Sequence, residues 1–169
     1  MRSFVSTLLV GAALGLCVPA GAQESSSAAL TPLAHRGFVT ERTTAERAVA
    51  FRPFVPDRQP IQVALLPPFH GGQVSANEGI AYAYGRRGRT WILSEWPRNG
   101  GTLSAFAPFP TAREPRCDDV HAVGGSERPR GVAWSTPRGI VLTLTPDGSA
   151  DPRTLVTEWH RLVRRGACR

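Results

Sequence analysis

The side chains best suited to chemistry lie in one short stretch, at Cys117, Asp118, Asp119 and His121. If this stretch is a β-strand, Cys117, Asp119 and His121 share one face, because side chains along a strand alternate with a period of two. Thiolate, carboxylate and imidazole are zinc ligands, but a structural zinc site needs about four of them in a tetrahedral arrangement. The stretch does not supply four, so we assign no metal site and interpret it as an acidic strand start with a surface histidine.

A His-Gly-Gly loop at residues 70–72 has the composition of the loops that form oxyanion holes in lipases and esterases. Those enzymes also need a Gly-x-Ser-x-Gly turn after a strand. The Gly-Gly-Ser-Glu-Arg stretch at residues 124–128 does not fit that pattern. We therefore predict that His70 lies in a surface loop and assign no catalytic residue.

Two carboxylates, Glu78 and Glu95, lie in the predicted central hairpin and could oppose each other. A pair of carboxyl groups can do acid–base work when their environments separate their pKa values. The simpler interpretation is that they pair with nearby arginines such as Arg98.

Four aromatic residues of the same hairpin are the candidate binding residues: Tyr82, Tyr84, Trp91 and Trp96. Facing solvent, they would form a strip for a peptide, glycan or lipid. Facing inward, they would be core residues, which is the commoner role of alternating aromatic side chains on a strand.

The elements that must position these residues follow from hydrophobic periodicity. Leu155, Trp159 and Leu162 fall at helical spacing after Pro152 and form one apolar stripe, so we predict a C-terminal helix that ends near Gly166.

The 169 residues suit a single domain. The predicted fold is α+β: an antiparallel sheet of about five to seven strands, with the C-terminal helix packed on one face and a short N-terminal helix. A capping box, with Thr43 as N-cap and Glu46 three residues on, is predicted to start that first helix. Strands are predicted at residues 61–66, 79–84, 90–96, 102–109, 120–123, 132–135 and 140–145.

The N-terminus has the features of a secretory leader. Arg2 is the only charge before Glu24, an apolar run follows it, and Ala20-Gly21-Ala22 is a small-x-small cleavage site. We predict a signal peptide at residues 1–22, a flexible spacer at 23–42 and one α+β domain at 43–169. The alternatives are an uncleaved anchor and a lipoprotein lipidated at Cys17. The mature chain is expected to be exported, periplasmic or extracellular, and soluble once the leader is removed.

Two cysteines remain after the leader is removed. Cys117 and Cys168 are an even pair in an oxidising compartment, so we predict a disulfide between them.

The chain carries a formal charge of +7, and all 20 of its basic residues are arginine. Clusters occur only at Arg86-Arg87-x-Arg89 and at Arg164-Arg165. The first is interpreted as a solvated turn, and the second as a helix C-terminus, where cations are favoured. The alternative is a contact with a polyanion or an anionic surface. Export argues against nucleic acid as the partner.

The order of elements resembles that of the small extracytoplasmic domains of bacterial anti-sigma-factor regulators and of some envelope lipoproteins. A short helix leads into the sequence FRPFVP at residues 51–56, and a hairpin with the aromatic strand Tyr-Ala-Tyr at 82–84 follows. A Gly-Gly turn, the strand Val-Ala-Trp at 132–134 and a terminal helix complete the order. The resemblance implies a sensing or binding module without catalysis, and it carries over no functional residue.

From these observations we predict an exported, non-enzymatic binding or sensing domain of the cell envelope, without cofactor. Its partner would be a protein, peptide, glycan or lipid. The alternative is a small hydrolase or metal-dependent enzyme with a site near His70, Cys117 and His121.

Overall fold

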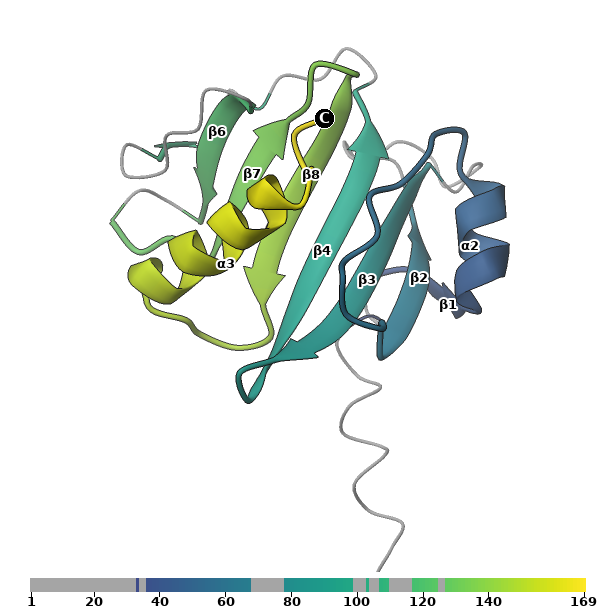
Figure 1. Cartoon of the computed structure of the whole chain (residues 1–169), viewed down its shortest axis with the longest axis horizontal. Coiled ribbons are helices and arrows are strands. Elements are labelled where there is room, and N and C mark those ends of the chain that lie inside the picture. Colours follow the sequence, from purple (N-terminus) through teal and green to yellow (C-terminus); the bar gives the residue numbers. More distant parts are fainter. Residues whose placement is uncertain are drawn as a thin grey trace, which may run out of the picture.

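The fold is an α+β arrangement built on one antiparallel sheet, as predicted. It was obtained as a computed structural model of the whole chain. The structure describes residues 33, 36–67, 78–98, 103, 107–109, 117–124 and 127–169. Within these residues the sheet has eight strands, in the order β1-β2-β3-β4-β8-β7-β6-β5 (Figure 1). Their bounds are β1 Phe38–Thr40, β2 Gln62–Leu66, β3 Gly79–Arg86, β4 Arg89–Pro97, β5 Ala107–Pro108, β6 Asp118–Val123, β7 Gly131–Ser135 and β8 Ile140–Pro146.

The long central ladder is set by a tight turn between β3 and β4. Arg86 pairs with Arg89, and the two residues between them, Arg87 and Gly88, have φ values of 51° and 69°. Positive φ at both positions is the type I′ geometry, whose twist matches that of the flanking strands. The turn fixes the register along β4, which also pairs with β8.

Both helices cover the same face of the sheet. Helix α2 (Arg42–Ala48) packs through Ala45 against a cluster that includes Val63 and Tyr82. Helix α3 (Pro152–Arg164) lies over β7 and β8 (Figure 1). The opposite face carries smaller side chains, among them Ala64, Ala81 and Ala83, and these are buried too. The strands β2 and β7 are therefore buried on both faces rather than on one.

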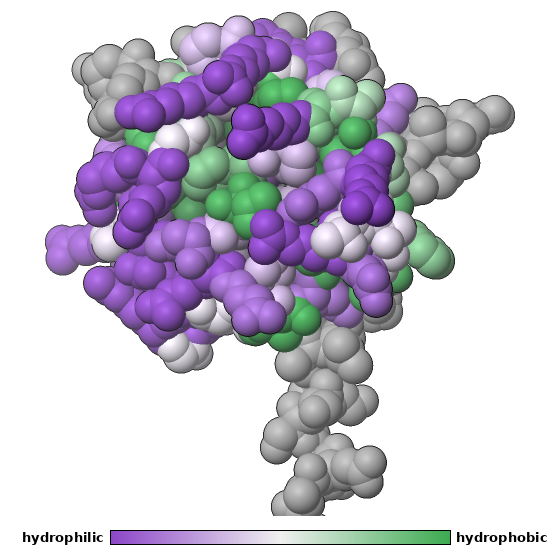
Figure 2. All heavy atoms as spheres, turned by 45° about the vertical axis from the view of Figure 1, so that its right-hand side comes forward, coloured by the Kyte–Doolittle hydropathy of each residue, from purple (hydrophilic) through white to green (hydrophobic). Residues whose placement is uncertain are grey.

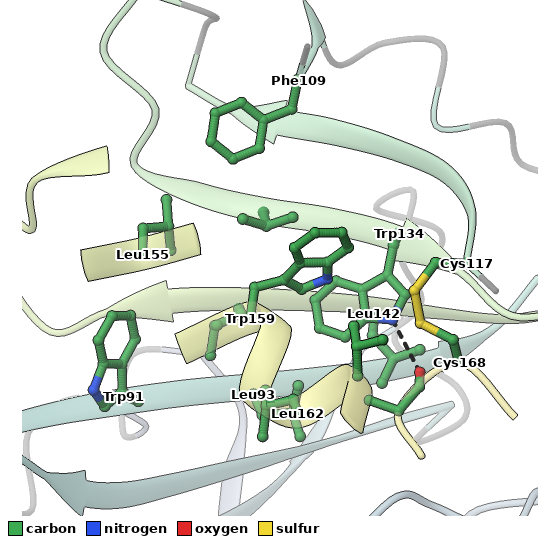
Figure 3. Packing of buried hydrophobic residues seen from close by; sticks show 14 of the residues in the cluster. Trp91, Leu93, Phe109, Cys117, Trp134, Leu142, Leu155, Trp159, Leu162 and Cys168 are labelled. Atoms are coloured by element: carbon green, nitrogen blue, oxygen red, sulfur yellow. Dashed lines mark hydrogen bonds between the residues drawn. A yellow bond between two sulfur atoms is a disulfide. The ribbon is translucent and has the colours of Figure 1, made fainter. Parts of the chain in front are cut away.

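Helix α3 is held by the apolar stripe that its sequence predicts. Leu155, Trp159 and Leu162 are completely buried (Figure 3). The ring of Trp159 packs edge-on against that of Trp134, with their centroids 6.3 Å apart. The Trp134 Nε1–H donates to the Ala167 carbonyl oxygen at 3.0 Å, which also ties the chain after the helix to the core.

Both ends of α3 are capped. At the first turn, the Thr154 N–H donates to the Asp151 carboxylate at 2.9 Å, and Pro152 occupies the predicted first helical position. At the other end, Gly166 has a φ of 105°, and the Ala167 N–H donates to the Leu162 carbonyl at 3.1 Å. This is a Schellman motif, in which a glycine takes the left-handed conformation that side chains disfavour.

The predicted capping box at the first helix is wrong. Helix α2 begins at Arg42, its N-cap is Glu41, and no side chain caps it. Glu46 instead pairs with the Arg42 Nε at 2.6 Å and accepts a hydrogen bond from the Tyr82 hydroxyl at 3.3 Å. Tertiary contacts with β3 and a pair on the helix surface have replaced the local cap.

The folded domain also starts earlier than predicted. Phe38–Thr40 lies inside the predicted spacer but pairs with β2. Leu33 is completely buried, and its N–H donates to the Gln62 side-chain oxygen at 3.3 Å. The predicted leader at 1–22 lies outside the described residues. Among the residues that are described, no helix has the length and apolar character needed to cross a membrane.

The structure pairs the two predicted cysteines. Cys117 and Cys168 form a disulfide with their Cα atoms 5.0 Å apart, across a sequence separation of 51 residues. Both are buried in the cluster that contains Trp134 and Trp159 (Figure 3). The bond joins the tail beyond α3 to the start of β6.

Replacing Trp159 with alanine tests the packing of α3. We expect Trp159→Ala to lower the free energy of unfolding by about 3–5 kcal/mol, as large-to-small changes of buried aromatic residues do. Trp159→Phe is the matched control. The buried Trp159 N–H has no hydrogen-bond partner, so phenylalanine removes no bond and should cost much less. Denaturant unfolding of the three proteins measures both effects, and an unchanged midpoint for Trp159→Ala would contradict the packing.

Candidate functional site

The four aromatic candidates do not form an exposed strip. Tyr82 and Tyr84 are completely buried and Trp91 is 2% exposed, all on the face that the helices cover. Trp96 is half-buried on the opposite face, where its Nε1–H donates to the Pro67 carbonyl at 3.0 Å. Tyr82, Tyr84 and Trp91 are therefore core residues and Trp96 is partly covered, so the placement of the four does not support the prediction that they form a binding surface.

Large apolar side chains that do reach solvent lie near one edge of the sheet. Among the described residues they are Phe38, Val39 and Ile61, on and beside β1 and β2. On the face drawn in Figure 2, hydrophilic side chains surround separate apolar patches.

The described part of the Cys-Asp-His stretch does not assemble a metal or catalytic centre. Cys117 forms the disulfide with Cys168, so it offers no thiolate to a metal ion. His121 lies on β6 opposite Ala133. No group of three His, Cys, Asp or Glu residues within the described part of the chain is placed to hold a metal ion. His70 and the side chain of Asp119 lie outside the described residues, so the alternative enzyme site stays a prediction.

The carboxylates Glu78 and Glu95 do not oppose each other. The register of β3 and β4 places Glu95 opposite Ile80, and on its other side Glu95 is opposite Leu142 of β8. Glu95 is 1% exposed. One carboxyl oxygen accepts the Phe54 N–H at 2.9 Å, and the other is buried and has no hydrogen-bond partner among the described residues.

These surroundings favour the neutral acid at position 95. Burial is the main cause that raises the pKa of Glu95 to about 8, and the nearby charge of Glu46 adds to it. The hydrogen bond from the Phe54 N–H acts in the opposite direction but does not offset burial. At neutral pH, Glu95 is mostly a protonated acid inside the core.

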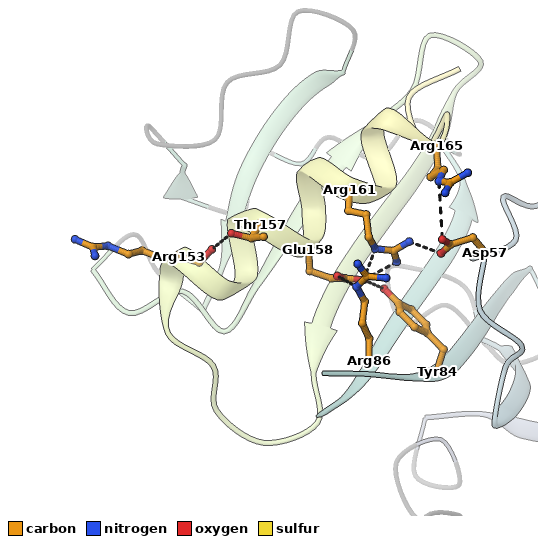
Figure 4. Close-up of polar contacts among 8 residues, drawn as sticks. All are labelled: Asp57, Tyr84, Arg86, Arg153, Thr157, Glu158, Arg161 and Arg165. Atoms are coloured by element: carbon orange, nitrogen blue, oxygen red, sulfur yellow. Dashed lines mark hydrogen bonds and ion pairs between the residues drawn. The ribbon is translucent and has the colours of Figure 1, made fainter. Parts of the chain in front are cut away.

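A second buried carboxylate, Glu158 of α3, is fully paired (Figure 4). It is 5% exposed. It accepts hydrogen bonds from the Tyr84 hydroxyl at 3.0 Å and from the Arg161 Nε at 3.0 Å, and its other oxygen lies 3.0 Å from the Arg86 Nε. A carboxylate at this depth requires such pairing, because an uncompensated buried charge is strongly destabilising.

The same network continues to the irregular segment between α2 and β2. Arg161 pairs with Asp57, and Arg165 lies 3.9 Å from the same carboxylate (Figure 4). Burial tends to raise the pKa of Asp57, but the hydrogen bond and charge of Arg161, with the charges of Arg165 and Arg86, lower it below its ordinary value. Asp57 therefore anchors its segment to α3 at any pH well above its pKa.

Beside this network, four arginines line a surface hollow of about 420 Å³, called here the arginine hollow. Its lining is Arg58, Gly85, Arg86, Arg87, Gly88, Arg89 and Thr90. The lining contains no carboxylate. Four arginines in one lining, with no acid among the lining residues, make the hollow a candidate site for an anion.

The arginines of the hollow divide into two held and two available side chains. Arg86 is held by Glu158, and the Arg89 guanidinium donates to the Ser149 carbonyl oxygen. Arg58 and Arg87 are exposed, and neither has an ion pair within the described residues. The first two give the hollow a fixed wall, and the other two can turn toward a ligand.

A larger hollow, of about 600 Å³, adjoins the start of α3. Its lining combines acid, base and apolar groups, namely Glu127, Arg128, Pro129, Arg130, Gly148, Ser149, Ala150 and Pro152. This mixture does not select one class of ligand as clearly as the arginine hollow does.

Sequence reasoning identified three of the four arginines but missed the fourth. Arg86, Arg87 and Arg89 are neighbours in one turn, so their cluster is visible in the sequence. Arg58 reaches them only because Asp57 is anchored to α3, and no periodicity marks that irregular segment.

Comparisons with known proteins give no further guidance. Models of known protein families, curated proteins and solved structures all yield no match to this chain.

The raised pKa of Glu95 predicts how stability depends on pH. The folded state holds this proton more tightly than the unfolded state, so stability should fall as pH rises from about 4.5 to about 8. The whole shift corresponds to roughly 5 kcal/mol. Glu95→Gln should remove this dependence and be the more stable protein above pH 8.

Denaturant unfolding between pH 5 and 9 compares the wild type, Glu95→Gln and the exposed control Glu127→Gln. The control should follow the wild type. Parallel pH profiles for the wild type and Glu95→Gln would show that Glu95 is not a buried acid.

Proposed function

We propose that this protein is an exported, non-enzymatic binding domain of the cell envelope that takes an anionic ligand in the arginine hollow. The observation that carries the proposal is the convergence of Arg58, Arg86, Arg87 and Arg89 on one concavity whose lining has no acid. Glu158 offsets the charge of Arg86, and Asp57 is paired with Arg161, which is outside the hollow. Arg58, Arg87 and Arg89 have no ion pair among the described residues, so the hollow keeps a positive charge.

Arginine selects a particular class of anion. Its planar guanidinium offers a rigid set of donors that matches phosphate, sulfate and carboxylate groups with two parallel hydrogen bonds. Several arginines around one hollow favour a group with many acceptor oxygens and more than one charge. Phosphate or sulfate groups, on a sugar or a lipid of the envelope, have this chemistry.

The turn that carries Arg87 supports a role for this side chain. Arg87 has a φ of 51°, in the left-handed region where Asn, Asp and Gly are favoured. An arginine is not the residue that turn geometry selects there. Its long charged side chain at the tip of the β3–β4 hairpin instead fits a contact with a ligand.

The proposal of export rests on covalent chemistry and on the predicted leader. A disulfide is typical of oxidising compartments outside the cytosol, and this domain contains one between Cys117 and Cys168. The resemblance to extracytoplasmic sensing domains points the same way. A domain that senses an anionic component of the envelope would need both export and an anion site such as the arginine hollow.

Neutralising the two available arginines tests the proposal. With sucrose octasulfate as probe, Arg58→Gln with Arg87→Gln should weaken binding by about tenfold or more, because each lost charged hydrogen bond is worth about 1.5–3 kcal/mol. Isothermal titration calorimetry at fixed, low ionic strength measures the affinity.

The matched control is Arg47→Gln with Arg138→Gln, which removes the same charge elsewhere. Arg47 lies on α2, and Arg138 lies in the β7–β8 turn at the opposite end of the sheet. The control should bind almost as tightly as the wild type. An equal loss in both double variants, or no loss in either, would contradict a site at the arginine hollow.

A further inference from the structure

The irregular segment between α2 and β2 connects the buried acid Glu95 with the arginine hollow. It crosses the sheet on the same side as the two helices (Figure 1). Its Phe54 N–H donates to Glu95, its Asp57 pairs with Arg161, and the next residue, Arg58, lines the hollow. Only three residues lie between Phe54, which contacts the acid, and Arg58, which lines the hollow.

Glu95 is placed where only its neutral form is well accommodated. Its cross-strand neighbours Ile80 and Leu142 are apolar, and its second carboxyl oxygen has no hydrogen-bond partner. An ionised carboxylate there would lack the two or three donors that buried charges need. It could gain water only if the covering segment moved away.

The charged groups around Glu95 do not supply the missing donors. Helix α2 contributes Glu46, a like charge, and Arg42 is already paired with Glu46. From β3, the Tyr82 hydroxyl donates to Glu46. Burial, the main cause, raises the pKa of Tyr82, so this phenol stays protonated through the range in which Glu95 titrates.

We propose that protonation of Glu95 regulates anion binding at the arginine hollow by holding the segment from Phe54 to Arg58 in place. This inference rests on the proposed function. With Glu95 neutral, the segment stays packed and Arg58 lines the hollow. When Glu95 loses its proton, hydration of the carboxylate favours the lifted segment, and Arg58 leaves the site.

The coupling has a definite sign. Anion affinity is higher at low pH and falls as Glu95 ionises. Because coupling between two ligands is reciprocal, anion binding in turn favours the protonated acid and draws a proton from solution near the middle of the titration. A purely structural Glu95 would alter stability without altering affinity between molecules that remain folded.

The test compares sucrose octasulfate binding at pH 6.5 and 9.5. Arginines keep their charge throughout this range, as do the sulfate groups of the probe. For the wild type and for the control Glu127→Gln, we expect affinity to fall by about fivefold or more between the two pH values. Glu95→Gln should keep its pH 6.5 affinity at both. A fall in Glu95→Gln equal to that of the wild type would overturn the inference.

Trypsin cleavage after Arg58 reports the position of the segment without any ligand. The ratio of cleavage rates between the wild type and Glu95→Gln, taken at the same pH, cancels the pH dependence of the protease. We expect a ratio near one at pH 7 and a rise of about threefold or more at pH 9. A ratio that does not change with pH would also overturn the inference.

The two proposals fail in different ways. If the Arg58/Arg87 double variant binds the probe like the wild type, the proposed site is wrong. If that variant loses binding while the wild type and Glu95→Gln share one pH profile, the site stands and only its regulation is wrong.

Discussion

The interaction on which the rest of the structure depends is the set of bonds to the buried Glu158 carboxylate. Glu158 is on the last helix, yet it holds Tyr84 and Arg86 of β3 as well as Arg161 one turn along its own helix. Since a charge at this depth must be compensated, the helix, the hairpin and the segment at Asp57 can occupy only a narrow range of relative positions. The lining of the arginine hollow comes from two of these parts, the hairpin and the segment that follows Asp57.

Helix α3 thus has two functions on adjacent sides. Its apolar stripe, with Trp159 against Trp134, covers β7 and β8 and is completely buried at Leu155, Trp159 and Leu162. The neighbouring polar side fixes the orientation of the helix relative to the sheet. Hydrogen bonds and ion pairs form only at defined distances and angles, whereas apolar contact is non-directional. The disulfide at Cys168 then fixes the chain beyond the helix to the start of β6, within the same core cluster.

Local signals in the sequence were sufficient for much of this architecture. The stripe of α3, its Pro152 start and Gly166 end, the central hairpin and the cysteine pair all depend on neighbouring residues or on simple pairing, and the structure confirms them. The cap at Thr43 was wrong because contacts of Glu46 with Arg42 and β3 outweigh a local cap. Strand β1 was missed because three residues carry no periodicity. Three of the four arginines of the hollow could be found in the sequence, because they are neighbours in one turn. Arg58 could not, since it meets the hairpin through a tertiary contact.

The role of Glu158 in positioning the hollow is tested most directly by the affinity of Glu158→Gln for sucrose octasulfate at pH 7. Thermal unfolding checks that the variant is folded. Coulomb's law alone predicts tighter binding, because a negative charge beside the arginine hollow is removed. We predict weaker binding, because Arg86 and Arg161 lose the carboxylate that positions them and, through Asp57, the segment that carries Arg58. Unchanged or tighter binding by a folded Glu158→Gln would contradict the central role of this buried carboxylate.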